Sequence, residues 1–216
     1  MIEIYLFVNP LGGICLNVEK DILKLVETEN KKIQFRFIPL VNMQTINHLI
    51  KLFEIPTHDI EQRNQLFEDI YSAALDYKAA QLQGKKKGRH LLLGLQQAVA
   101  VDNIPYSSEL AEKLVVEAGG DLDMFKADRQ SEFVKESFQT DQQIAREMGI
   151  VKHPSAVVYN YTCDRDFGVL VEDCDSMDEI KRLCETSEDT LQYFHEKFEL
   201  NHYEDSRVPH GHLHLL

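Results

Sequence analysis

The sequence predicts an α/β protein whose sheet is built from both ends of the chain, with a large all-helical insertion between its second and third strands. Residues 1–41 have the pattern of a strand, a helix and a strand, and the residues from 155 onward have the pattern of two strands and a helix. Between about Asn42 and Gly149 the apolar residues recur at helical spacing with polar breaks. We therefore expect one sheet with strands near residues 2–8, 33–39, 155–162 and 167–172.

The first unit begins with an apolar run at residues 2–8, which is typical of a buried strand. A helix is predicted over residues 13–30, because apolar residues recur there every three or four positions. They are Ile14, Val18, Ile22, Leu25 and Val26. Residues 33–37 then alternate apolar and polar side chains, which indicates a second strand. This order of strand, helix and strand predicts two parallel strands joined by a right-handed crossover.

The helical insertion divides at its glycines and serines. Gly84 ends its first long helix, Ser107 or Ser108 caps a later one, and Gly149 ends the last, where glycine suits the left-handed C′ position. We interpret the basic stretch GKKKGR, residues 84–89, as a solvated turn rather than an anion site. The predicted helices span residues 60–83, 88–101, 105–119 and 123–149.

Beyond residue 155, two apolar runs predict an antiparallel hairpin that turns at residues 164–166, and a helix follows from about Ser176. Cys163 and Cys174 lie at opposite ends of this hairpin, roughly 20 Å apart at about 3.4 Å per residue, which is too far for a disulfide. We therefore expect reduced thiols throughout. The four cysteines form no CxxC pair and have no zinc-site spacing: they are Cys15, Cys163, Cys174 and Cys184.

The composition restricts the classes of function. The chain has 216 residues, of which 36 are acidic and 23 basic, and a formal charge of −13. This charge opposes nonspecific binding to nucleic acid or an anionic membrane, so we expect a protein or small-molecule partner. The first residues lack a basic region and a long apolar run, which predicts a cytoplasmic protein. We interpret His210, His212 and His214 as part of a mobile C-terminal tail. We therefore assign neither a metal nor a cofactor to the protein.

Two motifs carry a resemblance to a known family. NPLGGIC, residues 9–15, follows the first strand, and AREMGIVKHPSAVV, residues 145–158, joins a helix, a glycine stop, a proline and a strand in that order. Both resemble the DsbA family of thioredoxin-fold proteins, in which a helical domain is inserted after the second strand. The resemblance implies a thioredoxin-like domain of residues 1–41 and 149–200, a helical insertion domain of residues 42–148, and a tail of residues 201–216.

The resemblance also implies a groove that binds a partner. In the family a cis proline stands beside the active-site thiols, so the bond between His153 and Pro154 is expected to be cis and to face the loop from Gly12 to Cys15. A partner strand would dock there by β-augmentation, using the backbone of the residue before the proline. The implied partner-binding residues are Gly12, Gly13, Ile14, His153, Pro154 and Ser155.

The loop departs from the family at the attacking thiol. Members commonly carry the motif DPxCPxC, and NPLGGIC places Gly12 at the attacking cysteine and Cys15 at the resolving one. Because Gly12 offers no thiolate, dithiol oxidoreductase activity is not expected. Cys15 has two interpretations, a catalytic monothiol at a helix N-terminus or a small buried core residue, and the second is favoured.

Three functions agree with these features. The leading one is a cytosolic protein-binding adaptor, because the chain resembles the YjbH or SpxH group of Gram-positive bacteria, which delivers the regulator Spx to the ClpXP protease. A glutathione-dependent isomerase or transferase is an alternative, although no serine or threonine lies between Pro10 and Cys15. A monothiol disulfide oxidoreductase that uses Cys15 is the third.

Overall fold

The computed structural model describes residues 1–29, 31–56, 58–162, 167–172, 174 and 177–185, together with the backbone of residues 213–215. The chain divides into two compact units. We call the first the sheet unit and the second the helical unit. The sheet unit contains Met1–Phe7, Asn17–Ile38 and the described residues of Lys152–Leu216, and the helical unit contains Val8–Leu16 and Pro39–Val151. The domain limits at residues 41 and 149 that the resemblance implies stay a prediction.

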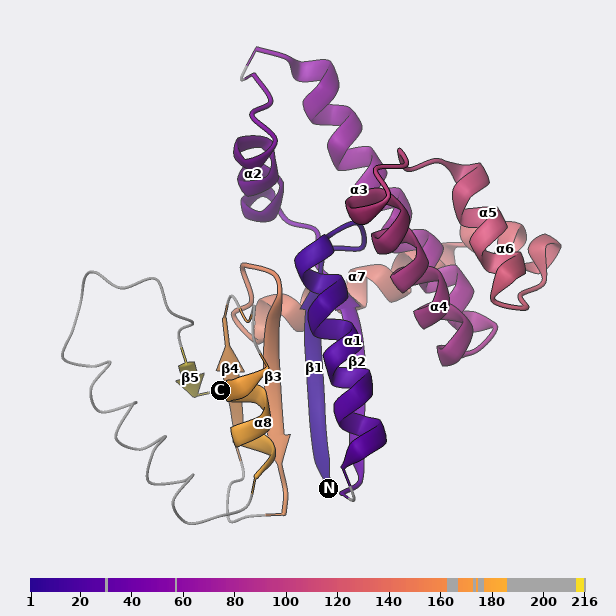
Figure 1. Ribbon diagram of the computed structural model, residues 1–216. Helices are drawn as coiled ribbons and strands as arrows, with labels where there is room; N and C mark the ends of the chain where they lie inside the picture. Colours follow the sequence, from indigo (N-terminus) through magenta and orange to yellow (C-terminus); the bar gives the residue numbers. More distant parts are fainter. Residues whose placement is uncertain are drawn as a thin grey trace. The chain divides into compact units, whose positions relative to one another are not determined.

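The sheet unit holds a five-stranded sheet within the described residues, in the order β2-β1-β3-β4-β5 (Figure 1). β3 pairs antiparallel with both β1 and β4, and β4 pairs antiparallel with β5. The four predicted strands and the hairpin are confirmed, whereas β5 lies where we expected a mobile tail. The strands are β1 (Ile2–Val8), β2 (Ile33–Pro39), β3 (Ser155–Asn160), β4 (Gly168–Val171) and β5 (Leu213–Leu215).

β1 and β2 run parallel to one another. At one end the amide of Ile2 donates a hydrogen bond to the carbonyl of Lys32 (3.0 Å), and at the other the amide of Leu40 donates to the carbonyl of Val8 (2.9 Å). Both strands therefore advance in the same direction, as a connection through a helix requires. That helix is α1 (Gly13–Thr28), so the predicted β-α-β unit is confirmed.

The last described helix, α8 (Asp178–Cys184), is attached to the sheet by two side chains. Asn160, at the end of β3, donates from its amide to the carbonyl of Leu183 (3.0 Å). Lys31, which precedes β2, donates to the carbonyl of Cys184 (2.9 Å). These bonds satisfy carbonyl groups in the last turn that have no partner within the helix. Cys163 and the predicted turn at residues 164–166 lie outside the described residues.

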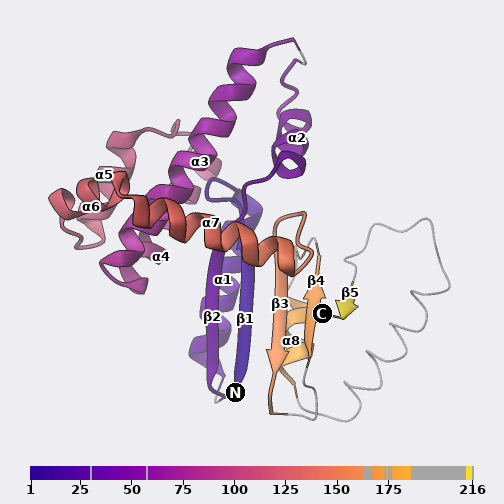
Figure 2. The ribbon, with the colours of Figure 1, turned by 180° about the vertical axis from the view of Figure 1, so that it is seen from behind.

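The helical unit contains every element between β2 and β3 (Figure 2). Residues 58–148 are all described and contain no strand, so the predicted all-helical insertion is confirmed. No helix of the described part is long and apolar enough to cross a membrane. The elements are α2 (Met43–Leu52), α3 (Ile60–Leu82), α4 (Lys85–Gln96), the π-helix η1 (Gln97–Val101), α5 (Ser108–Glu117), α6 (Leu122–Gln130) and α7 (Glu132–Glu147).

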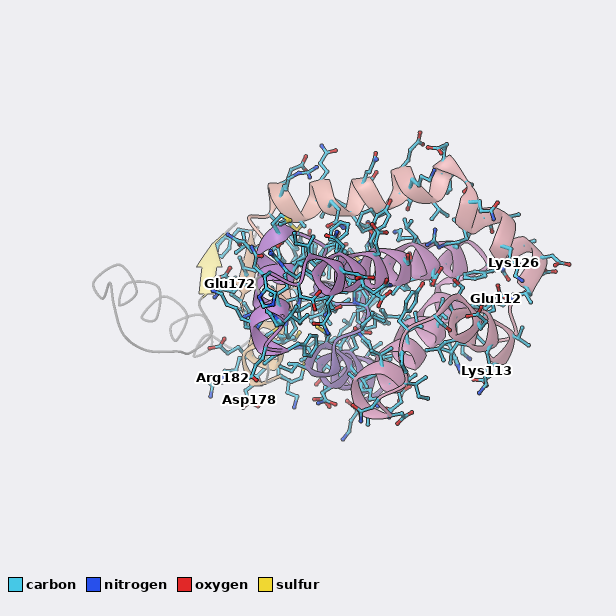
Figure 3. All side chains as sticks on the ribbon, turned by 90° about the horizontal axis from the view of Figure 1, so that it is seen from above. Glu112, Lys113, Lys126, Glu172, Asp178 and Arg182 are labelled. Carbon is cyan, nitrogen blue, oxygen red and sulfur yellow. The ribbon has the colours of Figure 1, made fainter. Side chains whose placement is uncertain are left out.

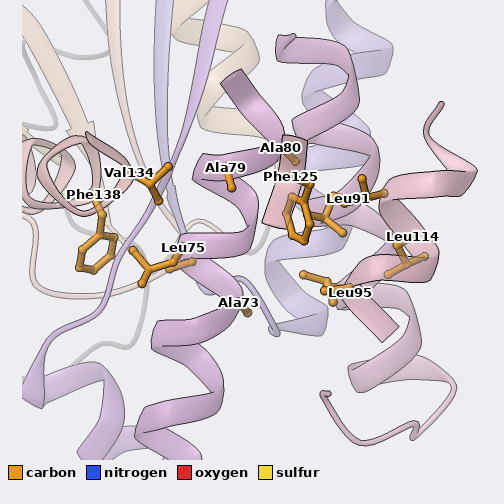
Figure 4. Packing of buried hydrophobic residues seen from close by; sticks show 13 residues of the cluster. Ala73, Leu75, Ala79, Ala80, Leu91, Leu95, Leu114, Phe125, Val134 and Phe138 are labelled. Carbon is orange, nitrogen blue, oxygen red and sulfur yellow. The ribbon is translucent and has the colours of Figure 1, made fainter. Parts of the chain in front are cut away.

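Small side chains on α3 let neighbouring helices approach it closely (Figure 4). Ala73, Ala79 and Ala80 are almost completely buried. On α4, a Cβ added at Gly88 would lie 2.5 Å from the Cγ of Gln81, so only glycine allows this contact. Burial of the surrounding large side chains supplies the hydrophobic stabilisation of the unit. They include Leu75, Leu91, Leu95, Leu114, Phe125, Val134 and Phe138.

Two details of the insertion differ from the prediction. The helix expected over residues 123–149 is broken at Ser131, whose extended backbone (φ −71°, ψ 148°) ends α6 and whose hydroxyl accepts from the amide of Val134 to cap α7. Serine competes for backbone groups in this way, and helical periodicity on both sides of the break concealed it. The basic residues 85–89 form the start of α4 rather than a turn.

Ion pairs in the helical unit differ in how far they are buried. Lys78 of α3 and Asp141 of α7 form a buried pair with 2.7 Å between Nζ and Oδ2. Lys126 of α6 and Glu112 of α5 pair at 2.9 Å on the surface (Figure 3). Exposed pairs contribute little to stability because water competes for both charges. The buried pair is different, since losing one partner leaves an uncompensated charge in the interior.

Candidate functional site

The turn that follows β1 is organised by Asn9, which is 3% exposed. Its side-chain Oδ1 accepts from the amide of Leu11 (3.0 Å), forming an Asx-turn, and its carbonyl accepts from the amide of Gly12 (3.0 Å). A Cβ added at Gly12 would lie 3.0 Å from the Cβ of Asn9. The turn therefore favours glycine at this position, and the amide of Leu16 makes the first helical hydrogen bond of α1 to the Gly12 carbonyl (3.1 Å).

Cys15 is the third residue of α1 and is only 1% exposed. Its sulfur accepts a hydrogen bond from the amide of Asn9 at 3.2 Å. A thiol with almost no accessible surface cannot be reached by a disulfide substrate unless the surrounding structure moves. The geometry therefore agrees with the interpretation of Cys15 as a small buried core residue that closes the turn.

The π-helix η1 supports the other side of this turn. Gln96, the last residue of α4, donates from its buried side-chain amide to the carbonyl of Asn9 (3.0 Å). A Cβ added at Gly13 would come within 3.1 Å of the Cβ of Ala100 in η1. Segments far apart in the sequence thus hold the start of α1, which explains why residues 8–16 belong to the helical unit. π-Helical turns are often found beside functional sites.

A polar network fixes the segment that follows η1. The Asp76 carboxylate on α3 accepts from the hydroxyl of Tyr106 (2.6 Å) and from Nε of Arg129 on α6 (2.6 Å). Burial raises the pKa of Asp76, and the two hydrogen-bond donors oppose that shift. Burial also raises the pKa of Tyr106, and the adjacent carboxylate adds to the effect. The network therefore serves a structural role in positioning the segment between η1 and α5.

The second segment of the predicted site lies at the start of β3, in the sheet unit. The His153–Pro154 peptide bond is cis, as predicted. The Pro154 carbonyl accepts from the amide of Cys174 (2.8 Å) and from its thiol (3.3 Å). These two bonds hold the buried Cys174, three residues after the end of β4, against the cis proline. The thiol acts here as a hydrogen-bond donor in the interior of the unit.

A family profile described as thioredoxin matches residues 5–182, which is most of the chain. The chain belongs to the thioredoxin family. Among solved structures, this thioredoxin-family chain is similar to the cytosolic disulfide reductase DsbM from Pseudomonas aeruginosa, with a TM-score of 0.52 and 16% identity over 92% of this chain and 99% of DsbM. It is also similar to the oxidoreductase DsbA from Xylella fastidiosa, with a TM-score of 0.51 and 16% identity over 73% of this chain and 72% of that chain. These likenesses show a DsbA-like thioredoxin fold.

The curated relatives of this thioredoxin-family chain have higher identity. The ClpXP adapter protein SpxH of Bacillus subtilis is 30% identical over 79% of this chain and 62% of that protein. The protein of the same name from Staphylococcus aureus is 32% identical over 74% of this chain and 56% of that protein. The chain therefore spans about six tenths of the length of the relatives it matches.

The predicted partner-binding residues differ widely in exposure. Ile14 is 57% exposed, Gly12, Gly13 and His153 are half-buried, and Pro154 and Ser155 are buried. The loop from Gly12 to Ile14 belongs to the helical unit and the cis proline to the sheet unit. Their predicted apposition, and with it the partner-binding assignment, stays a prediction. Within this thioredoxin-family fold, Ile14 is the member of the set best exposed to meet a partner.

Three structural residues of the two segments were not recognised from the sequence. Asn9 could have been found, because an Asn-Pro pair after a strand is typical of an Asx-turn. Gln96 carries no local signal, since its partner is the carbonyl of Asn9 in a distant segment. In the sequence nothing separates Cys174 from the other thiols, because its contact with Pro154 exists only after the hairpin has folded.

We predict that Ser155→Ala raises the free energy of unfolding by about 1 kcal/mol, because it removes a buried hydroxyl that lacks a compensating bond. Ser155 is 0% exposed, and its Oγ has no hydrogen-bond partner among the residues that the structure describes. Urea denaturation of the wild type and of Ser155→Ala measures the difference in the free energy of unfolding. Ser131→Ala is the matched control, and it should lower stability by about 1 kcal/mol because that hydroxyl caps α7. A destabilised Ser155→Ala variant would contradict the prediction.

Proposed function

We propose that this protein is a cytoplasmic adaptor that binds a regulator of the Spx type and delivers it to the ClpXP protease. The relatives named ClpXP adapter protein SpxH support this proposal. The observation that carries it is the loop after β1. There Gly12 stands where a dithiol enzyme needs its attacking cysteine, and the one thiol of the loop, Cys15, is buried.

The same loop argues against thiol chemistry as the main activity. An attacking thiolate must be exposed, and its reactivity depends on a pKa lowered by nearby positive charge. Cys15 instead has its sulfur inside the turn, where it accepts from the Asn9 amide. A glutathione-dependent transferase would need a hydroxyl near the start of α1, and residues 11–14 are Leu, Gly, Gly and Ile. Recognition of a protein needs neither group.

Ile14 is our candidate for the centre of the partner surface. It is an apolar side chain, 57% exposed, on the second residue of α1 and next to the Gly12–Gly13 backbone. A few apolar anchors usually supply most of the free energy of a protein interface. A charge placed at such an anchor opposes binding because the interface must then desolvate it.

We predict that Ile14→Asp lowers the rate of ClpXP-dependent degradation of an Spx-type regulator at least about tenfold at limiting adaptor, a loss typical of an interface anchor. The assay contains purified ClpXP, the regulator and the adaptor, and follows the regulator over time. Val116→Asp is the matched control, because Val116 on α5 is 55% exposed and lies outside the predicted site. Equal loss in both variants, or none in either, would contradict the assignment of Ile14.

The enzyme alternatives are tested with Cys15→Ser. Under the adaptor hypothesis this variant delivers the regulator at the rate of the wild type, and neither protein reduces insulin disulfides at an appreciable rate. Turnover of insulin that disappears in Cys15→Ser would instead establish the monothiol oxidoreductase. Circular dichroism should confirm that the variant is folded, since Cys15 lies in the core.

A further inference from the structure

The outer edge of β4 is covered by a strand that is distant in the sequence. β4 ends at Val171 and β5 begins at Leu213, and the two pair antiparallel with Leu170 opposite His214 (Figure 1). β5 contains three residues, so the ladder that holds it is short. A ladder of three residues offers few main-chain hydrogen bonds, so little free energy holds β5 against β4. The edge of β4 is therefore a place where strands can exchange.

The register shows which kind of strand fits this edge. Opposite residues of neighbouring strands lie on the same face of a sheet. One row across the sheet runs through Leu6, Ala156 and Val171 to position 213. A second row runs through Ile4, Val158 and Val169 to position 215.

The residues of these rows on β1, β3 and β4 are all apolar and at most 2% exposed. Positions 213 and 215 therefore continue two buried apolar rows of the sheet. Position 214 lies on the opposite face, in the row of Val157 and Leu170, which are also buried. A strand that adds to β4 thus continues two apolar rows if it has apolar residues at two alternate positions, and Leu-His-Leu does so.

We propose that the edge of β4 is a docking site for an extended segment of a partner protein with apolar residues at positions i and i+2, and that β5 occupies this site as a competing strand within the chain. The proposal extends the proposed function, because it takes the partner to be a protein and adds a second docking element to the adaptor. Main-chain hydrogen bonds would supply affinity, and the two apolar positions would supply selectivity. Binding of the partner would require β5 to leave.

The first test is hydrogen exchange of the β4 amides in the full chain. Successive amides of a central strand point alternately to its two neighbours. Removing β5 should therefore speed exchange at least about tenfold only for the amides that faced it, while the alternate amides that face β3 stay protected. Proline lacks the amide proton, so it removes a donor from the ladder. Two variants are needed, because either the amides of residues 213 and 215 or the amide of residue 214 point towards β4. The first is Leu213→Pro combined with Leu215→Pro, and the second is His214→Pro. His210→Pro is the control, since it places the same substitution outside β5.

The second test adds a labelled peptide with the sequence of residues 210–216 to each protein. The proline variant that loses β5 should bind the peptide at least about tenfold more tightly than the wild type, whose site is filled. In that variant the bound peptide should also restore slow exchange to the β4 amides that had faced β5. A peptide in which the two leucines at 213 and 215 are serine should bind at least about tenfold more weakly. Peptide bound at the edge of β4 slows exchange of these same amides, whereas peptide bound elsewhere on the protein leaves them unchanged.

Unchanged exchange in both proline variants would overturn the occupancy of the edge by β5. Faster exchange without peptide binding would overturn the docking site and leave β5 as a simple edge cover. A dimer that the proline variants dissociate would overturn competition within one chain. These measurements use the chain alone, so they can fail while regulator delivery by ClpXP succeeds, and delivery can fail while they succeed.

Discussion

Asp141→Asn should lower the free energy of unfolding by about 3–5 kcal/mol, the cost of leaving a buried charge without its partner. The Asp141 side chain is 0% exposed and lies 2.7 Å from Nζ of Lys78, whose side chain is 6% exposed. The amide that replaces the carboxylate cannot neutralise the ammonium group. Because the pair joins α3 to α7, the helical unit should lose stability. Urea denaturation followed by circular dichroism measures the effect.

Two controls separate the buried charge from other consequences of the substitution. Lys78→Met combined with Asp141→Leu should recover most of the lost stability, because no unpaired charge remains in the interior. Glu132→Gln removes the carboxylate of the exposed pair with Lys135 and should cause no measurable change. If the double variant were as unstable as Asp141→Asn, lost packing rather than charge would be responsible.

Gly12→Cys should create a dithiol with Cys15 and, with dithiothreitol present to return the oxidised pair to the dithiol, raise the rate of insulin disulfide reduction at least about tenfold above the wild type. The introduced thiol would precede α1, three residues before Cys15, and would supply the attacking group that the chain lacks. Its Cβ would lie 3.0 Å from the Cβ of Asn9, so the turn must shift by a few tenths of an ångström. We expect this to cost about 1–2 kcal/mol of stability.

Gly12→Ser is the matched control, because it introduces a side chain of similar size without a thiol. It should share the loss of stability but remain inactive towards insulin. Mass spectrometry after oxidation tests whether the introduced thiol and Cys15 form a disulfide. If the disulfide forms but activity does not rise, the missing thiol is not what prevents turnover. The burial of Cys15 would then be the dominant cause, since the resolving sulfur must also be reachable.

Much of the fold could be predicted because it depends on local patterns. Neighbouring residues alone indicate three of its features. They are the alternation in β2, the helical period of α3 and the glycine that follows α7. The cis bond before Pro154 was expected from the resemblance of its surrounding motif. The break at Ser131 was missed because apolar residues keep a helical period on both sides of it. β5 was missed because three residues carry too little periodicity to indicate a strand.

The candidate site was predicted less completely, for a related reason. Gly12, Cys15 and Pro154 stand in recognisable motifs, and their types alone excluded a CxxC mechanism. The partners of these segments come from elsewhere in the chain: Gln96 reaches Asn9, and Cys174 reaches the Pro154 carbonyl. Such contacts join residues far apart in sequence, and no periodicity records them.

By itself, the sequence determined the α/β class, the helical insertion, the absence of a paired thiol beside Cys15 and the resemblance to DsbA proteins. Each depends on residue type and spacing within a short segment. Only the tertiary structure decided that Cys15 is buried, that Ser155 lacks a hydrogen-bond partner in the described part of the chain, and that β5 covers the edge of β4. Burial and edge pairing depend on which distant segments come together. The free energy of packing the whole chain decides which segments do so.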